Sequence, residues 1–186
     1  LTFTDCTMTD ARFGVDINGG NEYVYSLSSL SFENCTGEVY FFIMEQYLPV
    51  GVQSLMTVNG ITFTDCDGLD VSFEVKDCPV LRADCIFIAV SDLTVLNSQM
   101  SLEFKSNGNI PFLYESEPEW MNGTMGGILL NSPEFTNSIV DVSMQYTGSI
   151  TAVGLAVNPE NFENHAIEVW GIKVQSLKST NTTFEV

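Results

Sequence analysis

Few side chains in this sequence have the type and spacing that catalysis requires. The chain has one histidine, His165, and two arginines, Arg12 and Arg82. A lone histidine is more often structural than catalytic. The sequence contains no Gly-x-Ser-x-Gly, Cys-x-x-Cys or phosphate-binding glycine loop. We therefore expect no catalytic residues and no resident cofactor, and we expect that the protein is not an enzyme.

One short segment offers oxygen ligands of the kind that calcium prefers. Asp16, Asn18, Asn21 and Glu22 surround a Gly-Gly turn. Their spacing does not match that of an EF-hand loop, which is the best-defined calcium signature of this length. A hydrated turn explains the same residues, so calcium binding stays an alternative here.

The five cysteines fall into two groups. Cys78 and Cys85 flank a short segment that contains a proline, which predicts a disulfide, with two free thiols as the alternative. Cys6, Cys35 and Cys66 recur at one position of a repeat, where we expect small buried residues. A metal or redox role for these three is disfavoured because no histidine accompanies them.

Composition and charge exclude several classes of protein. Of 186 residues, 45% are apolar and 16% are charged, which is typical of a folded domain rather than a disordered tail. The 24 acidic residues against 6 basic ones give a net charge of −18. Such a polyanion repels phosphate backbones, so we expect no nucleic-acid partner. No run of 18 apolar residues occurs, so we expect no membrane-spanning helix.

Three Asn-x-Ser/Thr triplets favour an extracellular or cell-surface location with N-linked glycans. They begin at Asn34, Asn122 and Asn181, and we expect the last two to be accessible. The chain begins at Leu1 rather than at methionine, so we expect a processed product or a part of a longer chain.

The clearest feature of the sequence is a repeat of about 30 to 40 residues. Each repeat contains a block that alternates apolar and polar residues, with a second strand before it and a third after it. Three strands per repeat, joined by one short and one variable corner, predict one coil of a parallel β-helix. The blocks begin at Leu1, Leu30, Ile61, Leu93, Pro133 and Ile172. The inward positions are Phe3, Phe32, Phe63, Val95, Phe135 and Val174.

A polar column follows each block, where the chain turns a tight corner. Asparagine and aspartate tolerate the left-handed backbone of such corners, and stacked amides can hydrogen-bond along the column. The predicted ladder consists of Asp5, Asn34, Asp65, Asn97, Asn137 and Ser176.

This pattern resembles the right-handed parallel β-helix, or pectin-lyase-like, superfamily over essentially the whole chain. The Leu-x-Phe-x-Asn-Cys block is similar to the repeats of large secreted or surface proteins of microbes and protists. The resemblance implies an all-β solenoid of five to six coils with three strands per coil, forming one domain over residues 1–186. Long insertions, 106–126 and 147–165, are expected at one corner in the C-terminal half. The superfamily includes polysaccharide lyases and hydrolases, but no catalytic residue of theirs can be placed on this sequence.

The first long insertion combines aromatic residues with carboxylates. Phe112, Tyr114 and Trp120 lie in the same loop as Glu115, Glu117 and Glu119. Such a loop could dock a neighbouring subunit or a glycan. The alternative is a loop that folds back over the flank of the solenoid, with its acids in water.

No helical pattern caps either end of the repeat array, and an uncapped β-helix exposes unpaired backbone. Contact between unlike ends does not close, so it produces a filament. We expect Phe3 and Phe13 at one end and Val174 and Phe184 at the other to supply the contacts. The sequence therefore predicts an extracellular structural protein, a subunit of a filament or surface layer whose partner is itself. An adhesin or glycan-binding module and a polysaccharide lyase or hydrolase stay as alternatives.

Overall fold

The chain is built from β-strands, as the alternating sequence pattern predicts. The computed structural model describes residues 1–16, 25–44, 54–76, 85–106, 110–113, 123–147, 150–153 and 167–185. Within these ranges no helix occurs that is long and apolar enough to cross a bilayer.

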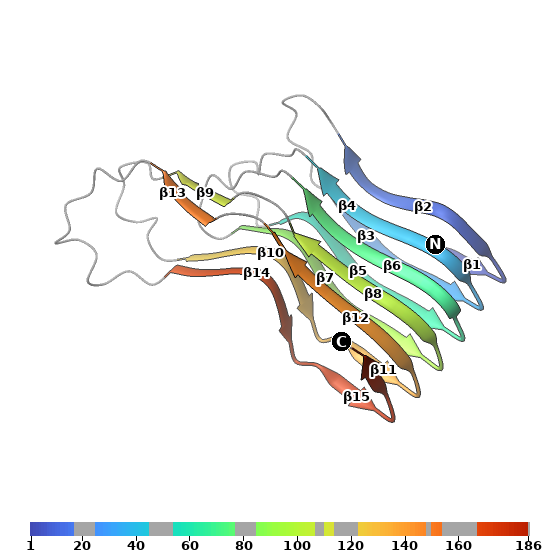
Figure 1. Cartoon of the computed structure of the whole chain (residues 1–186). Coiled ribbons are helices and arrows are strands. Elements are labelled where there is room, and N and C mark those ends of the chain that lie inside the picture. Colours follow the sequence, from blue (N-terminus) through green and yellow to red (C-terminus); the bar gives the residue numbers. More distant parts are fainter. Residues whose placement is uncertain are drawn as a thin grey trace.

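Two large sheets of parallel strands make up the body of the molecule (Figure 1). The first sheet has the order β1 (Thr2–Thr4), β3 (Tyr25–Glu33), β5 (Ser54–Thr64), β7 (Cys85–Leu96), β10 (Gly123–Asn131) and β14 (Ile167–Gln175), with β11 (Glu134–Thr136) and β15 (Lys178–Thr180) beside them. The second sheet has the order β16 (Thr183–Glu185), β12 (Ile139–Tyr146), β8 (Gln99–Ser106), β6 (Asp67–Lys76), β4 (Thr36–Met44) and β2 (Thr7–Asp16).

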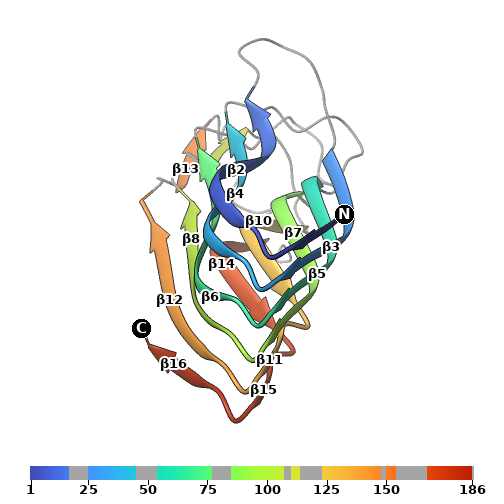
Figure 2. The ribbon, with the colours of Figure 1, turned by 90° about the vertical axis from the view of Figure 1, so that its right-hand side faces the viewer.

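The chain alternates between the two sheets, so each strand pairs with the equivalent strand of the repeat before or after it. Phe32 on β3, for example, pairs with Phe3 on β1 and with Phe63 on β5. Figure 2 shows the two sheets facing each other and converging toward the turns that join them. Equivalent side chains of successive repeats therefore lie in rows across each sheet.

The first two strands of a repeat form one bent strand, where the sequence analysis predicted two separate ones. In β3, β5 and β7 the bend lies at Ser29, Gly60 and Asp92, whose φ angles are 56°, 70° and 57°. One left-handed residue redirects the chain, and pairing continues on both sides of it. The described repeats therefore form two main sheets and not three.

Stacked phenylalanines fill the space between the sheets. Phe73 lies between Phe41 and Phe104, with ring centroids 4.8 and 5.3 Å away and nearly parallel planes. Phe32 stacks on Phe63 at 5.1 Å in the facing row. All five rings are buried, because alternation directs every second side chain of each strand into the core.

The sixth repeat begins five residues later than the sequence analysis predicted. Val174 pairs with Leu130, and Ser179 pairs with Phe135. Val174 therefore does not continue the inward column of Phe135, and the block begins at Leu177 instead of Ile172. The prediction failed because the strand before the block alternates in the same way as the block itself.

The two long insertions contain a further pair of parallel strands. β9 (Ile110–Leu113) pairs with β13 (Ile150–Val153) in register. The predicted boundary of the first insertion was wrong at its C-terminal side, because Gly123–Gly126 belong to β10.

Candidate functional site

A groove on the outer face of the second sheet is lined by four acidic residues. It has a volume of about 370 Å³ and is formed by strands β4, β6, β8 and β12. We call it the acidic groove. Its lining residues are Glu38, Tyr40, Asp70, Val71, Ser72, Ser101, Leu102, Glu103, Asp141 and Ser143.

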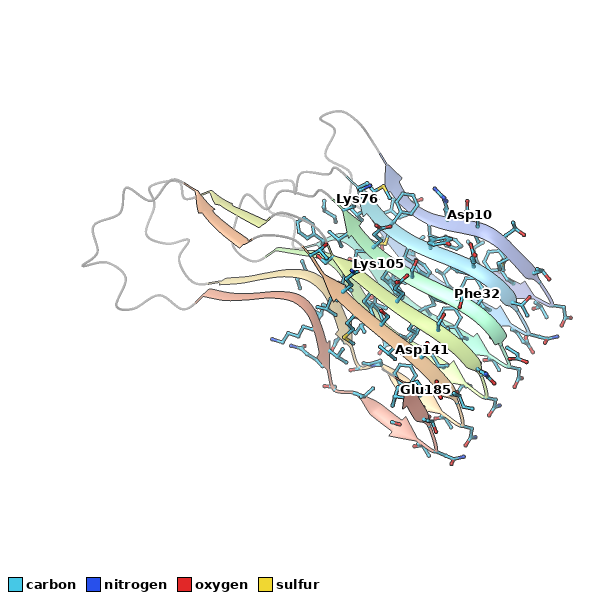
Figure 3. The ribbon with its side chains drawn as sticks, viewed as in Figure 1. Asp10, Phe32, Lys76, Lys105, Asp141 and Glu185 are labelled. Carbon is cyan, nitrogen blue, oxygen red and sulfur yellow. The ribbon has the colours of Figure 1, made fainter. Side chains whose placement is uncertain are left out.

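Strand register brings the polar residues of the acidic groove into two rows. Glu38 pairs with Asp70, Asp70 with Ser101, and Ser101 with Asp141. Neighbouring members of a row are about 4.8 Å apart, because that is the separation of paired strands. The second row consists of Tyr40, Ser72, Glu103 and Ser143. Figure 3 shows Asp141 on this outer face, with Asp10 and Glu185 on the terminal strands of the same sheet.

Hydrogen bonds inside the acidic groove use only part of its acceptor capacity. The Tyr40 hydroxyl donates to Oε2 of Glu38 across 2.8 Å. The Ser101 hydroxyl donates to Oδ1 of Asp70. Nζ of Lys105 lies 2.6 Å from Oε2 of Glu103. Asp141 has no hydrogen bond or ion pair with another described residue, so its carboxylate is available to water or a ligand.

Tyr40 is held in its neutral form. Its hydrogen bond to Glu38 is the largest cause of a raised pKa, and partial burial and the negative charge of Glu38 act in the same direction. The guanidinium of Arg12, 5.8 Å from the centre of the Tyr40 ring, opposes these effects weakly. Tyr40 is therefore a hydrogen-bond donor, and the charge of the groove comes from its carboxylates.

Ser72 is the most enclosed polar residue of the acidic groove. Ser72 is only 9% exposed, and its hydroxyl makes no hydrogen bond to another described residue. Buried hydroxyl groups ordinarily have a partner, since losing water without replacement is costly.

A ladder of side-chain amides follows the tight corner between the sheets. Nδ2 of Asn181 donates to Oδ1 of Asn137 at 3.0 Å, and Nδ2 of Asn137 donates to Oδ1 of Asn97 at 3.3 Å. At the other end Nδ2 of Asn34 donates to Oδ1 of Asp5 at 2.6 Å. Asp5, Asn34, Asp65, Asn97, Asn137 and Asn181 all have φ angles of 49° to 56°.

The sixth member of this ladder is Asn181, where the sequence analysis placed Ser176. Ser176 has a φ of 57° but lies at the other corner, in line with Ser132. The sequence signal for Asn181 as the sixth member is the triplet Thr180-Asn181-Thr182, which resembles Thr136-Asn137-Ser138 of the preceding repeat. Two of the three glycosylation candidates, Asn34 and Asn181, therefore direct Nδ2 along the ladder.

The three cysteines of the repeat form a column with the serines that follow them. Cys35 and Cys66 are buried, and Cys6 is half-buried. Desolvation raises the pKa of Cys66. The Ser98 hydroxyl oxygen accepts a hydrogen bond from the backbone N–H of Cys66 at 3.0 Å. A serine in this column therefore links its side chain to the backbone of the preceding repeat.

An apolar pocket of about 150 Å³ opens between the sheets at the C-terminal end of the stack. We call it the end pocket. Met144, Val174, Leu177 and Phe184 are its most exposed members. The complete lining is Leu102, Phe104, Leu130, Pro133, Phe135, Val142, Met144, Val174, Leu177 and Phe184.

The opposite end of the stack carries the other predicted contact residues, Phe3 and Phe13. Both are partly buried against the core, and their ring centroids lie 6.3 Å apart at an interplanar angle of 70°.

Several predicted site residues lie outside the described residues or have no described side chain. They are the calcium candidates Asp16, Asn18, Asn21 and Glu22, the disulfide candidates Cys78 and Cys85, and the glycosylation candidate Asn122. The others are the aromatic residues Phe112, Tyr114 and Trp120 of the first insertion, together with Arg82 and His165. Among the residues that are described, no three His, Cys, Asp or Glu side chains converge in a way that could hold a metal ion.

The comparisons with known proteins identify no family for this chain. No protein family, no curated protein and no solved structure matches it.

Proposed function

We propose that this chain is an extracellular structural protein that stacks head-to-tail with copies of itself into a filament or surface layer. Its fold in this proposal is a right-handed parallel β-helix, the handedness that crossovers between parallel strands ordinarily have. The observation that carries the proposal is the end pocket, an apolar opening beside the last strands of both sheets.

Strand edges support the proposed stacking. Among the described strands, β1 and β2 pair on one side only, and so do β14, β15 and β16 at the other end. Such edges present unpaired N–H and C=O groups to an incoming strand. A second copy placed in the same parallel sense continues both ladders, and because the two ends differ, the contact repeats without closing.

The apolar rows continue across the proposed joint. One inward row of the second sheet runs from Phe13 through Phe41, Phe73 and Phe104 to Met144. Because Met144 lines the end pocket, a second copy stacked on this end brings its Phe13 ring toward the pocket. Burying apolar surface is worth roughly 25 cal/mol per Å². In the other sheet, Phe3 of the second copy follows Phe135 and Ser179 in their row.

Negative charge at both ends of the stack opposes this head-to-tail contact. Asp10 and Glu185 lie on the outer face of the terminal strands β2 and β16, so stacking brings their carboxylates toward one another. The whole chain carries a net charge of −18. Assembly is therefore favoured by salt, which screens repulsion between exposed charges.

Electron microscopy and sedimentation of the purified chain at low and high salt test the proposal. Six repeats stacked along each sheet predict an axial repeat of about 29 Å, from the 4.8 Å strand separation. Leu177→Asp, at a residue 52% exposed at the end pocket, abolishes assembly. Ile139→Asp is the matched control, because Ile139 is 45% exposed but does not line the pocket. A wild-type chain that stays monomeric at every concentration and salt overturns the proposal.

A further inference from the structure

The acidic groove concentrates negative charge, and no basic residue in its lining compensates that charge. Glu38, Asp70, Glu103 and Asp141 line it, and none of its lining residues is basic. Like charges on adjacent strands destabilise a sheet. Lys105 compensates Glu103 from outside the lining, at 2.6 Å. Asp70 accepts only from the neutral Ser101 hydroxyl, and Asp141 has no partner among the described residues.

Ser72 supplies a second observation, independent of the charges. It lies in the row beside the carboxylates, is nine-tenths buried, and has no hydrogen-bond partner among the described residues. A hydroxyl both donates and accepts, so it can be satisfied by an N–H group in the groove. The unsatisfied hydroxyl therefore points to a bound polar molecule that reaches the floor of the groove.

We propose that the acidic groove binds a small linear polyamine. Its ammonium groups lie over the carboxylates of Glu38, Asp70 and Asp141, and one N–H donates to Oγ of Ser72. Charge-assisted hydrogen bonds of this kind are shorter and stronger than neutral ones. This binding site is separate from the end pocket, so it goes beyond the proposed function.

The distribution of charge selects a chain-like cation over a single ion. The carboxylates extend across four strands, roughly 14 Å, because adjacent strands are about 4.8 Å apart. No three of the described acidic side chains converge on one point, which a metal ion would require. A linker of three carbons matches the separation of Glu38 and Asp70, which lie on neighbouring strands. Asp70 and Asp141 lie two strands apart, roughly 10 Å, with Ser101 between them, so the rest of the amine must extend past Ser101.

The volume of the groove and the net charge of the chain restrict the class of ligand further. A volume of about 370 Å³ lies in the range of small-molecule sites and leaves little room for a folded partner. The net charge of −18 raises the local concentration of cations and repels anions. A cation is therefore favoured over a neutral sugar, which gains nothing from that field.

Calorimetric titration of the intact chain with spermidine at low salt tests the proposal. We expect one site, and we expect no binding of a neutral diol of similar length. The variant Asp70→Asn with Asp141→Asn weakens spermidine binding about tenfold or more, since it removes two charge-assisted contacts. Ser72→Ala weakens it about fivefold through the loss of one neutral hydrogen bond. Circular dichroism checks that each variant is folded.

The matched control removes two charges from the other sheet. Glu33→Gln with Glu134→Gln changes the net charge equally, at exposed positions on β3 and β11. Spermidine affinity that falls equally in the groove and control variants overturns the proposal, because the amine is then only a diffuse counterion. A lysine-rich peptide that binds the groove more tightly than spermidine overturns the small-molecule assignment. Leu177→Asp leaves spermidine binding unchanged, so failure of the filament proposal is distinguishable.

Discussion

The side-chain amide of Asn181 donates to the side-chain oxygen of Asn137 across 3.0 Å, although 44 residues separate them in the chain. Asn137 donates in turn to Asn97, so the three amides hydrogen-bond in one direction along the stack. Each also has a left-handed backbone, which costs an ordinary L-residue roughly 1–2 kcal/mol. Asparagine at this corner therefore serves two purposes, since it accepts the backbone conformation and links neighbouring repeats.

Asn137→Ala and Asn137→Gly separate these two contributions. Alanine loses both hydrogen bonds and incurs the backbone cost, so we expect a loss of about 2–3 kcal/mol in the free energy of unfolding. Glycine loses only the hydrogen bonds, and we expect about 1 kcal/mol. Urea denaturation measures both values. Equal losses in the two variants contradict the role given to the backbone at this corner.

Phe73 is the central ring of a three-ring stack, and its removal tests the core. Phe73→Ala leaves a cavity between Phe41 and Phe104, so we expect a loss of about 3–5 kcal/mol in unfolding free energy. Phe184→Ala is the control, because Phe184 is 36% exposed and its ring meets Phe135 edge-on instead of lying inside a stack. We expect Phe184→Ala to lower the free energy of unfolding by less than Phe73→Ala does. Denaturation midpoints that fall equally for both variants are inconsistent with the described core.

Gly37 has a φ of 97°, and a Cβ atom at that position collides with the carbonyl oxygen of Met8. Gly68 also has a positive φ, of 74°, but no atom lies within 4 Å of a Cβ built there. We expect Gly68→Ala to cost about 1–2 kcal/mol from backbone strain alone. Gly37→Ala costs more, because β2 must move away from β4. Thermal denaturation compares the two, and an equal or smaller loss at Gly37 contradicts the close approach of these strands.

The repeat could be predicted from Phe3, Phe32 and Phe63 because identical inward residues recur at nearly equal intervals. The prediction failed at the sixth repeat, where the inward position is Ser179. Ile172 and Val174 lie in the preceding strand, and they alternate with polar residues just as the residues of a block do. The acidic groove was not predicted at all. Glu38, Asp70 and Asp141 lie far apart in the sequence and belong to no motif, and only strand register brings them into one row. Counting outward positions from the aligned third strands is the signal that finds them.

The thiol of Cys66 should be unreactive in the folded chain. It is buried, and desolvation raises its pKa, so the reactive thiolate is disfavoured. Among the three cysteines of the column, we expect iodoacetamide to modify half-buried Cys6 first, and Cys35 and Cys66 only after unfolding. Peptide mapping by mass spectrometry measures the order. Modification of Cys66 as fast as Cys6 in the native chain contradicts its burial.

The raised pKa of Cys66 also has a consequence for stability. The folded chain holds this proton to higher pH than the unfolded chain does. The stabilisation is therefore complete below the unfolded pKa and is lost as the pH rises toward the folded one. Cys66→Ala should show a smaller loss of stability across that alkaline window, as measured by urea denaturation. An unchanged pH dependence contradicts the assignment.

Tyr40 reports directly on the acidic groove through its hydrogen bond to Glu38. That bond is the largest cause of its raised pKa, so Glu38→Gln should lower the pKa of Tyr40 toward its usual value. The control is Glu33→Gln, a carboxylate on the other sheet, which should leave Tyr40 unchanged. Nuclear magnetic resonance titration of labelled tyrosine measures the pKa in each variant. Because the folded state holds the phenolic proton more tightly, its stabilising effect is present below the unfolded pKa and fades at higher pH. A Tyr40 pKa that is the same with and without the Glu38 carboxylate contradicts the geometry of this row.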